Sequence, residues 1–143
     1  MKKITHKELL KEAILDRVYK KVLPDGVYNM PTAKWLKAEF IPFYIGVLKE
    51  LGIFEWNERF DCDDFASLFR ALAQISHRKS NGNGEGLTVA EIHYTASGTN
   101  GVYGDHAINM AFTDEGWVFI EPQNGSMREL SETEQKSIFY VHM

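Results

Sequence analysis

Apolar residues recur every three or four positions in the first half of the chain, and they alternate with polar residues in the second half. The first spacing is that of one face of a helix, and the second is that of one face of a β-strand. The helical pattern predicts a helix over residues 5–22, a helical region over 32–51 and a third helix with Asp61 as its N-cap. Because proline has no N–H to donate, we expect Pro42 to kink the second region or to divide it in two.

The third predicted helix has the clearest pattern. Asp61 is a good N-cap, and the carboxylates of Asp63 and Asp64 suit the positive end of a helix dipole. We expect this helix to end within residues 77–86, where basic residues are followed by glycines. One apolar stripe runs along it, formed by Phe65, Leu68, Phe69, Leu72 and Ile75.

Segments of period two follow the helices. They predict strands over residues 87–94, 106–112, 117–123 and 137–143. The glycine-rich stretch 95–105 fits either a flexible connection or a lid over a site. With helices first and strands after them, we predict a single α+β domain over residues 1–143, in which N-terminal helices pack on a small antiparallel β-sheet.

Composition narrows the function classes. The chain has 143 residues, a net charge of −4 and one cysteine. The negative charge argues against nucleic acid and membranes as partners, and a single cysteine excludes an internal disulfide.

The start of the chain carries Lys7, Glu8 and Lys11 where a signal peptide needs apolar residues, so we expect no signal peptide and favour the cytoplasm, with the compartment itself unknown. The sequence leaves the oligomeric state open and is compatible with a homodimer.

Three polar features stand out against this scaffold: Cys62 in DCDDFA, His106 in GDHAINM and Glu121 in EPQNG. A cysteine nucleophile needs a base to take its proton, and the base needs a third group that fixes its ring. These residues supply the three types of group in that order. Backbone N–H groups at a helix start favour a thiolate, whereas the neighbouring aspartates oppose it. We therefore expect a compensating cation beside Cys62, either protonated His106 or a metal ion.

The relation between His106 and Glu121 depends on one hairpin. If residues 114–115 form a two-residue turn, His106 faces Gln123 and lies diagonal to Glu121 on the same face of the sheet. The side chains can then bridge the roughly 7–8 Å between diagonal backbone positions. A three-residue turn would place the two side chains on opposite faces. In the first case Gln123 also lines the site.

These motifs resemble those of the papain-like and transglutaminase-like cysteine peptidases, and most closely those of the C-terminal protease domain of fungal agglutinins. The resemblance covers roughly residues 54–125 and rests on DCDDFA, GDHAINM and EPQNG. It implies a papain-like core, activation by calcium and a protein or peptide substrate. Carried over residue by residue, it makes Cys62 the nucleophile, His106 the base and Glu121 the acid that orients the base.

Two further groups of residues are candidates for supporting roles. No glutamine precedes Cys62 at the place of the usual oxyanion donor, so Asn57 or Trp56 would share that role with the backbone N–H of Cys62. The chemistry requires no cofactor, but oxygen ligands from Asp63 and Asp64 would suit a calcium ion better than zinc. By default, these acids cap the helix.

The sequence thus predicts a cysteine-dependent hydrolase of amide or peptide bonds. Three alternatives stay open: a transglutaminase-like acyltransferase, a catalytically inactive papain-like binding or assembly module, and a domain that binds calcium for structure. The inactive module is favoured if Cys62 is buried beyond the reach of His106, because a lone cysteine is more often a core residue than a reactive one. His93 and His142 have no evident partner and are interpreted as structural or surface residues.

Overall fold

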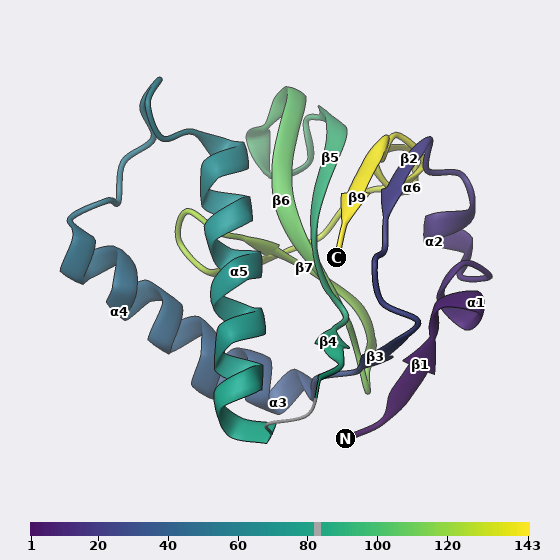
Figure 1. The fold of residues 1–143 in the computed structure, drawn as a ribbon. Helices are drawn as coiled ribbons and strands as arrows, with labels where there is room; N and C mark the ends of the chain where they lie inside the picture. Colours follow the sequence, from purple (N-terminus) through teal and green to yellow (C-terminus); the bar gives the residue numbers. More distant parts are fainter. Residues whose placement is uncertain (82–83) are drawn as a thin grey trace.

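The computed structural model describes residues 1–81 and 84–143. A six-stranded β-sheet forms the middle of the molecule (Figure 1). The long helices α4 (Ile41–Leu51) and α5 (Cys62–Asn81) lie on one side of it, and the short N-terminal elements lie on the other. Among the residues that the structure describes, no helix is long and apolar enough to cross a membrane. The chain is therefore an α+β fold with helical elements on both sides of a sheet.

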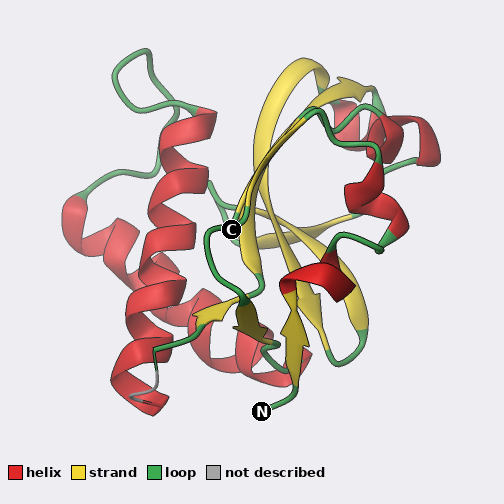
Figure 2. Cartoon of the chain, turned by 45° about the vertical axis from the view of Figure 1, so that its right-hand side comes forward, coloured by secondary structure: helices red, strands yellow, loops and turns green. Residues whose placement is uncertain are grey.

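The large sheet has the strand order β2-β9-β5-β6-β7-β8, and its strands curve around the core (Figure 2). The strands are β2 (Lys20–Val22), β5 (Val89–Ser97), β6 (Tyr103–Thr113), β7 (Gly116–Glu121), β8 (Ser126–Arg128) and β9 (Tyr140–His142). The pair β2–β9 is parallel, and the other pairs are antiparallel.

A three-stranded sheet of order β1-β3-β4 lies beside the large one. It consists of β1 (Lys3–Thr5), β3 (Val27–Asn29) and β4 (Gly86–Leu87), and β3 pairs with β4 in parallel. Both sheets are mixed, so the expectation of one antiparallel sheet is corrected. The parallel pairs join segments that are far apart in the sequence, and a local alternation pattern cannot reveal such partners.

The second helical region forms as expected. Thr32 caps α3 (Ala33–Trp35) by accepting a hydrogen bond from the Trp35 N–H at 3.0 Å. A π-helical turn, Leu36–Phe40, connects α3 with α4, and Pro42 lies in the first turn of α4. The Ile41 N–H donates to the Leu36 carbonyl across this turn, so the helical run is continuous, and the division expected at Pro42 takes the form of a π-helical turn just before it. The helix ends at Gly52, whose φ of +66° is the left-handed conformation that glycine adopts readily.

The first predicted helix, over residues 5–22, is wrong in its length. The capping box of Thr5 and Glu8 is present, but α1 spans only His6–Leu9 and α2 only Ala13–Asp16. The segment then becomes strand β2, which pairs with β9. The apolar spacing arises because Leu9, Leu15 and Val18 enter one core from a segment that turns repeatedly. Burial therefore reproduces a helical period without a continuous helix.

The third helix is confirmed from its first residue, but its buried stripe differs. Phe65 and Phe69 are fully buried, whereas Ile75 is 54% exposed. Ala73 takes the buried place on the next turn, and His77 continues that face. A small alanine at this position allows the helix to pack closely on the sheet. Ile75 does not belong to this buried row and lies on the outer face. Residues 82–83 of the expected glycine loop lie outside the described residues.

Each face of the large sheet carries its own core. The face toward the long helices is lined by Leu36, Phe40, Tyr44, Leu48, Phe65, Phe69, Val89, Ala111 and Ile120, among others. The opposite face packs on the N-terminal and C-terminal segments and includes Leu9, Leu15, Tyr28, Ile92, Tyr94, Ile108, Met110, Phe119 and Val141. The alternation of Ile108, Met110 and Ala111 between these cores confirms that both faces of β6 are buried.

The glycine-rich stretch 95–105 forms neither a lid nor a loose connection. Strands β5 and β6 pair as far as Ser97 and Tyr103, and a short 3₁₀ turn, Thr99–Gly101, joins them. Gly98 has a φ of +102°, and a Cβ atom there would lie 2.8 Å from the Tyr103 hydroxyl. These glycines therefore serve a tight hairpin that extends the sheet toward the start of α5.

Candidate active site

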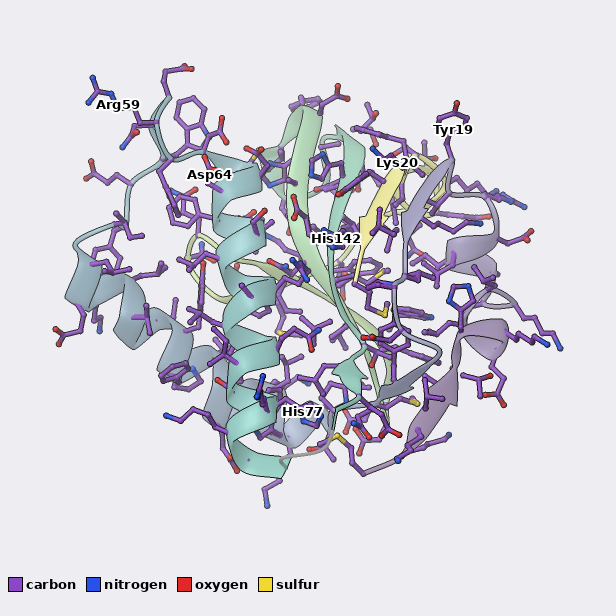
Figure 3. All side chains as sticks on the ribbon, in the orientation of Figure 1. Tyr19, Lys20, Arg59, Asp64, His77 and His142 are labelled. Atoms are coloured by element: carbon purple, nitrogen blue, oxygen red, sulfur yellow. The ribbon has the colours of Figure 1, made fainter. Side chains whose placement is uncertain are left out.

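The start of α5 presents Cys62 at the first helical position. The backbone oxygen of Asp61 accepts the first helical hydrogen bond from the Phe65 N–H at 3.0 Å. Asp64 reaches back, and its Oδ2 accepts a hydrogen bond from the Asp61 N–H at 3.1 Å. Figure 3 marks Asp64 at this end of the helix. Cys62 is a free, partly exposed thiol at a helix end with unpaired backbone N–H groups.

Helix α5 is held in place by aromatic contacts and by one buried amide. The Phe65 ring meets the Phe60 ring edge-on at a centroid distance of 4.7 Å, which anchors the turn before Cys62. Asn109, on β6, is fully buried and donates hydrogen bonds to the carbonyl oxygens of Ala66 at 2.9 Å and Ala90 at 3.1 Å. One side chain thereby connects the helix to β5 and β6 directly beneath the site.

The β6–β7 hairpin has the two-residue turn that the argument for His106 and Glu121 requires. Thr113 faces Gly116, and the ladder continues to the pair of Asn109 and Ile120. His106 and Glu121 consequently share a face, and His106 Nε2 lies 2.9 Å from Glu121 Oε2. The His106 side chain is 18% exposed and that of Glu121 is 8% exposed. The acid is thus buried and bonded to the ring, and the ring retains access to solvent.

Cys62 approaches the same ring. Because Nε2 is directed to Glu121, Nδ1 is the ring nitrogen that remains for the thiol. Burial lowers the pKa of His106, but hydrogen bonding and charge interactions with Cys62 and Glu121 outweigh it and raise the pKa to about 9. This raised pKa favours the protonated ring, whose positive charge is the kind of compensating cation that the sequence calls for.

A pocket of about 240 Å³ opens beside these groups. The described residues that line it are Cys62, Asp63, His93, Asp105, His106, Ala107 and Phe139. The thiol and the imidazole thus face a common space in which a substrate carbonyl can be placed. Larger hollows elsewhere on the surface lack a cysteine.

Several groups surround the Glu121 carboxylate. The backbone N–H of Gln123 donates to Oε1 at 3.3 Å, and Arg128 Nη2 lies 3.6 Å from Oε2. Burial, followed by the charges of Glu134 and Glu121, raises the pKa of Tyr94 to about 12, and the Tyr94 ring meets that of His106 edge-on at 5.9 Å. Glu121 is therefore an anchored anion, and its ring partner is confined by packing.

Three expected site residues lie elsewhere. Strand β7 ends at Glu121, so Gln123 falls in the following turn instead of facing His106, and its Nε2 donates to the Phe54 carbonyl at 3.3 Å. The Asn57 side-chain oxygen accepts hydrogen bonds from the N–H groups of Arg59 and Phe60, at 2.9 and 3.1 Å, within its own turn. Trp56 is 49% exposed. None of the three is among the described residues that line the pocket.

The acids beside Cys62 are arranged differently from the expected pair. Ligand atoms of Asp61, Cys62 and Asp63 lie within 4.8 Å of one another, whereas Asp64 is turned back to the helix cap. Hydrogen bonding with Asp63, followed by burial, raises the pKa of Asp61, as expected when two carboxylates compete for one place. Two such carboxylates fit a hard cation such as calcium, but a thiol does not. The acidic pair is thus Asp61 and Asp63.

His93 is the pocket residue that sequence reasoning missed. Its Nε2 lies 2.9 Å from Glu91 Oε1, and Glu91 also accepts a hydrogen bond from Ser67 Oγ at 2.8 Å. Glu91 is only 6% exposed. The signal was present in the strand pattern, because an acid and a histidine two positions apart share one face of a strand. Polar side chains that become buried between a strand and a helix are expected to form a hydrogen bond with each other.

Comparison with known proteins supports the fold. No family model and no curated protein matches the sequence. The solved structure described as the PSL1a–E64 complex matches with a TM-score of 0.74 and 24% identity, over 99% of this chain and 51% of that chain. A structure of the Polyporus squamosus lectin, bound to the human-type influenza-binding epitope Neu5Aca2-6Galb1-4GlcNAc, matches with a TM-score of 0.70 and 25% identity, over 99% of this chain and 49% of that chain.

These matches show an α+β fold that resembles that of PSL1a, and this chain spans about half the length of the chains it matches. The finer expectation of a papain-like core stays a prediction.

Proposed function

We propose that the chain is a cysteine-dependent hydrolase of amide or peptide bonds, in which Cys62, His106 and Glu121 act together. One observation carries the proposal: the His106 ring is bonded through Nε2 to a buried carboxylate and interacts with the only cysteine of the chain at one pocket. A nucleophile, a base and an orienting acid in this relation are what thiol acyl transfer requires. A protein or peptide is the proposed substrate.

The reaction follows from the positions of the groups. The Cys62 thiolate attacks the carbonyl carbon of the substrate, a C–S bond forms and the carbonyl oxygen takes the negative charge. The backbone N–H of Cys62, at the first position of α5, is placed to stabilise this oxygen. His106 then gives its proton to the leaving nitrogen as the C–N bond breaks. Water, activated by the neutral ring, releases the acyl group and restores the thiolate and the imidazolium.

Glu121 has an orienting role in this scheme. Its carboxylate holds Nε2 of His106, so the ring cannot turn away from Cys62 during the two proton transfers. The acid itself takes no part in the proton transfers: it accepts a hydrogen bond from the Gln123 N–H and faces Arg128. The non-catalytic module is less favoured, because Cys62 is partly exposed and lies within reach of His106.

Calcium enters the proposal as an activator. Asp61 and Asp63 are the carboxylates that would hold it, since Asp64 is engaged at the helix cap. A cation there would relieve the repulsion between the two acids and reduce the negative charge beside the thiolate. The chemical steps themselves use only Cys62, His106 and Glu121.

The test is the rate of Cys62 alkylation by iodoacetamide as a function of pH, in wild type and in His106→Ala. We expect rapid alkylation at pH 6 in wild type, because imidazolium stabilises the thiolate, and loss of this reactivity in His106→Ala. Hydrolysis of fluorescein-labelled casein, with Cys62→Ala as the inactive control, then measures turnover. His142→Ala is the matched histidine control, because that side chain lies on β9 and outside the pocket lining.

Two results would contradict the proposal. One is slow alkylation in wild type that rises only near pH 8.5, the ordinary range of a thiol, and is indifferent to His106. The other is a reactive thiol with no hydrolysis of any casein bond, which would favour the binding module. The same assay with and without calcium, and with a chelator, shows whether the acids beside Cys62 respond to the cation.

A further inference from the structure

A second histidine–glutamate pair, His93 and Glu91, borders the pocket through its histidine. His93 lines the pocket together with Cys62, and its Nε2 lies 2.9 Å from Glu91 Oε1. The proposed mechanism makes no use of either residue. A buried, bonded pair of this kind beside a thiol calls for a separate explanation.

Glu91 is built into the fold as an anchor. It is 6% exposed, and its second oxygen accepts a hydrogen bond from Ser67 Oγ on α5 at 2.8 Å. Burial raises the pKa of Glu91, but hydrogen bonds from His93 and Ser67 outweigh it and keep the pKa below its ordinary value. Glu91 is therefore an anion that accepts, and Nε2 of His93 is the nitrogen that donates.

This assignment fixes what His93 offers to the pocket. In the neutral ring that donates Nε2–H to Glu91, the other nitrogen, Nδ1, carries a lone pair and is an acceptor. Within the described part of the chain, no hydrogen bond uses that nitrogen. The ring is held on its other sides by Tyr140 and Phe139, at centroid distances of 4.8 and 6.1 Å. The His93 side chain is 29% exposed, so a ligand in the pocket can reach it.

The residues that line the pocket also suit an extended main chain as a ligand. Strand β5, which carries His93, is paired with β6, which carries His106, and both residues are among those that line the pocket. The exposed ring of Phe139 supplies an apolar wall. A peptide whose carbonyl lies at Cys62 would run along this wall. Its neighbouring N–H groups would then need hydrogen-bond acceptors.

We propose that His93 is a substrate-binding residue, which accepts a hydrogen bond from a main-chain N–H of a peptide bound at Cys62 and is held for that purpose by Glu91 and Ser67. The inference rests on the proposed function and adds to it a residue outside the proposed triad that binds the main chain of the peptide substrate. His93 thereby differs from His106, which acts on the thiol itself.

The experiment compares two thiol probes that differ in their need for the pocket. Iodoacetamide is small and reports the reactivity of the Cys62 thiolate, whereas the cysteine protease inhibitor E64 must also occupy the pocket. Rates of thiol loss are measured with both probes in wild type, His93→Ala and His93→Gln. In His93→Ala we expect the iodoacetamide rate to stay within about twofold of wild type and the E64 rate to fall by roughly three- to tenfold, the value of one hydrogen bond.

Two variants make the assignment specific. His93→Gln keeps a carbonyl acceptor at nearly the same place and is expected to restore much of the E64 rate. His6→Ala, on α1 and outside the pocket lining, is expected to leave both rates unchanged. With casein peptides as substrate, KM should rise in His93→Ala while kcat changes by less than about twofold, because a binding contact is lost.

Three outcomes would overturn the inference. An unchanged E64 rate in His93→Ala would show that the ligand does not touch this ring. Equal losses with both probes would show that His93 acts on the thiol, and failure of His93→Gln to recover the E64 rate would exclude an acceptor role. Failure of the proposed function is distinguishable from these results, because it appears in wild type and in His106→Ala with iodoacetamide alone. Thermal melts of each variant exclude a loss of folding as the cause.

Discussion

Replacing Glu121 with glutamine tests the electrostatic core of the proposed site. The substitution keeps the size of the side chain and removes the charge that lies 2.9 Å from the His106 ring. Because that ring is only 18% exposed, the charge acts with little screening by solvent. Glutamine can still accept from the Gln123 N–H, so the turn after β7 is expected to remain folded.

The magnitude follows from the pKa of His106. The pKa rises from 6.5 to about 9, and this difference corresponds to roughly 3 kcal/mol in favour of the protonated ring. Cys62 and Glu121 share this stabilisation against the opposing effect of burial. If Glu121 supplies about half, its removal costs roughly 1–2 kcal/mol, and the ratio of protonated to neutral His106 falls by roughly five- to thirtyfold at any given pH.

The assay is a pH titration of the ring nitrogens of His106 by NMR in ¹⁵N-histidine protein. We expect the titration midpoint of His106 in Glu121→Gln to lie clearly below that of wild type. Glu91→Gln, which alters the pair of His93 and Glu91, should leave the ratio of protonated to neutral His106 within about twofold of wild type. Since the thiol and the imidazole interact, the measured midpoints belong to the pair of groups. A wild-type midpoint near 6.5, or no change in Glu121→Gln, would refute the reasoning.

The raised pKa of His106 also determines how the stability of the fold depends on pH. The pKa of His106 in the folded protein lies above that of an unfolded histidine, so folding is favoured by proton uptake at this ring. This contribution is fully present below pH 6.5 and is lost as the pH rises toward about 9. Denaturant unfolding of His106→Gln and wild type should therefore differ most below pH 6.5 and converge above pH 9.

Three further predictions concern the scaffold and the acids. Phe69→Ala should lower the free energy of unfolding by about 3–5 kcal/mol in urea titrations, because its fully buried ring meets Phe40 and Tyr44 at 5.0 and 4.8 Å; a loss below about 1 kcal/mol would contradict the core described above. Calcium should raise the melting temperature of wild type and of Asp64→Asn but not that of Asp63→Asn, and an unresponsive wild type would remove calcium from the proposal. Gly98→Ala should cost at least about 1–2 kcal/mol in thermal melts, because of its positive φ and the Tyr103 hydroxyl, whereas Gly46→Ala, in α4 with open space around it, should be neutral or stabilising.

The sequence was sufficient wherever local pattern and local chemistry agree. Helix α5 begins at the predicted place because Asp61, Asp63 and Asp64 suit the start of a helix and a buried stripe follows them. For His106 and Glu121, the parity of the two strands could be predicted from the sequence and the turn length stayed open, and the two-residue turn of the structure then places both side chains on one face. Both arguments use neighbours in sequence, and neither requires knowledge of distant partners.

The sequence was insufficient where partners are distant. Strands β1, β2 and β3 are three residues each, and their partners lie elsewhere in the chain. His93 appeared isolated because its neighbour Glu91 was read only as part of a strand, and Ser67 comes from a helix. Gln123 was displaced because the strand ends two residues earlier than the apolar pattern suggested. In each case tertiary contacts decided what propensity left open.

The position of β9 determines when the pocket can be completed during synthesis of the chain. This strand lies between β2 and β5, and it covers the edge of β5 at Glu91, Ile92 and His93. During synthesis, Cys62, His106 and Glu121 leave the ribosome before β9 and before Phe139, which forms a wall of the pocket. Long-range pairing of this kind is slow to form. We therefore expect a nascent chain to carry its thiol without a finished pocket, which would delay hydrolysis until synthesis of this segment is complete.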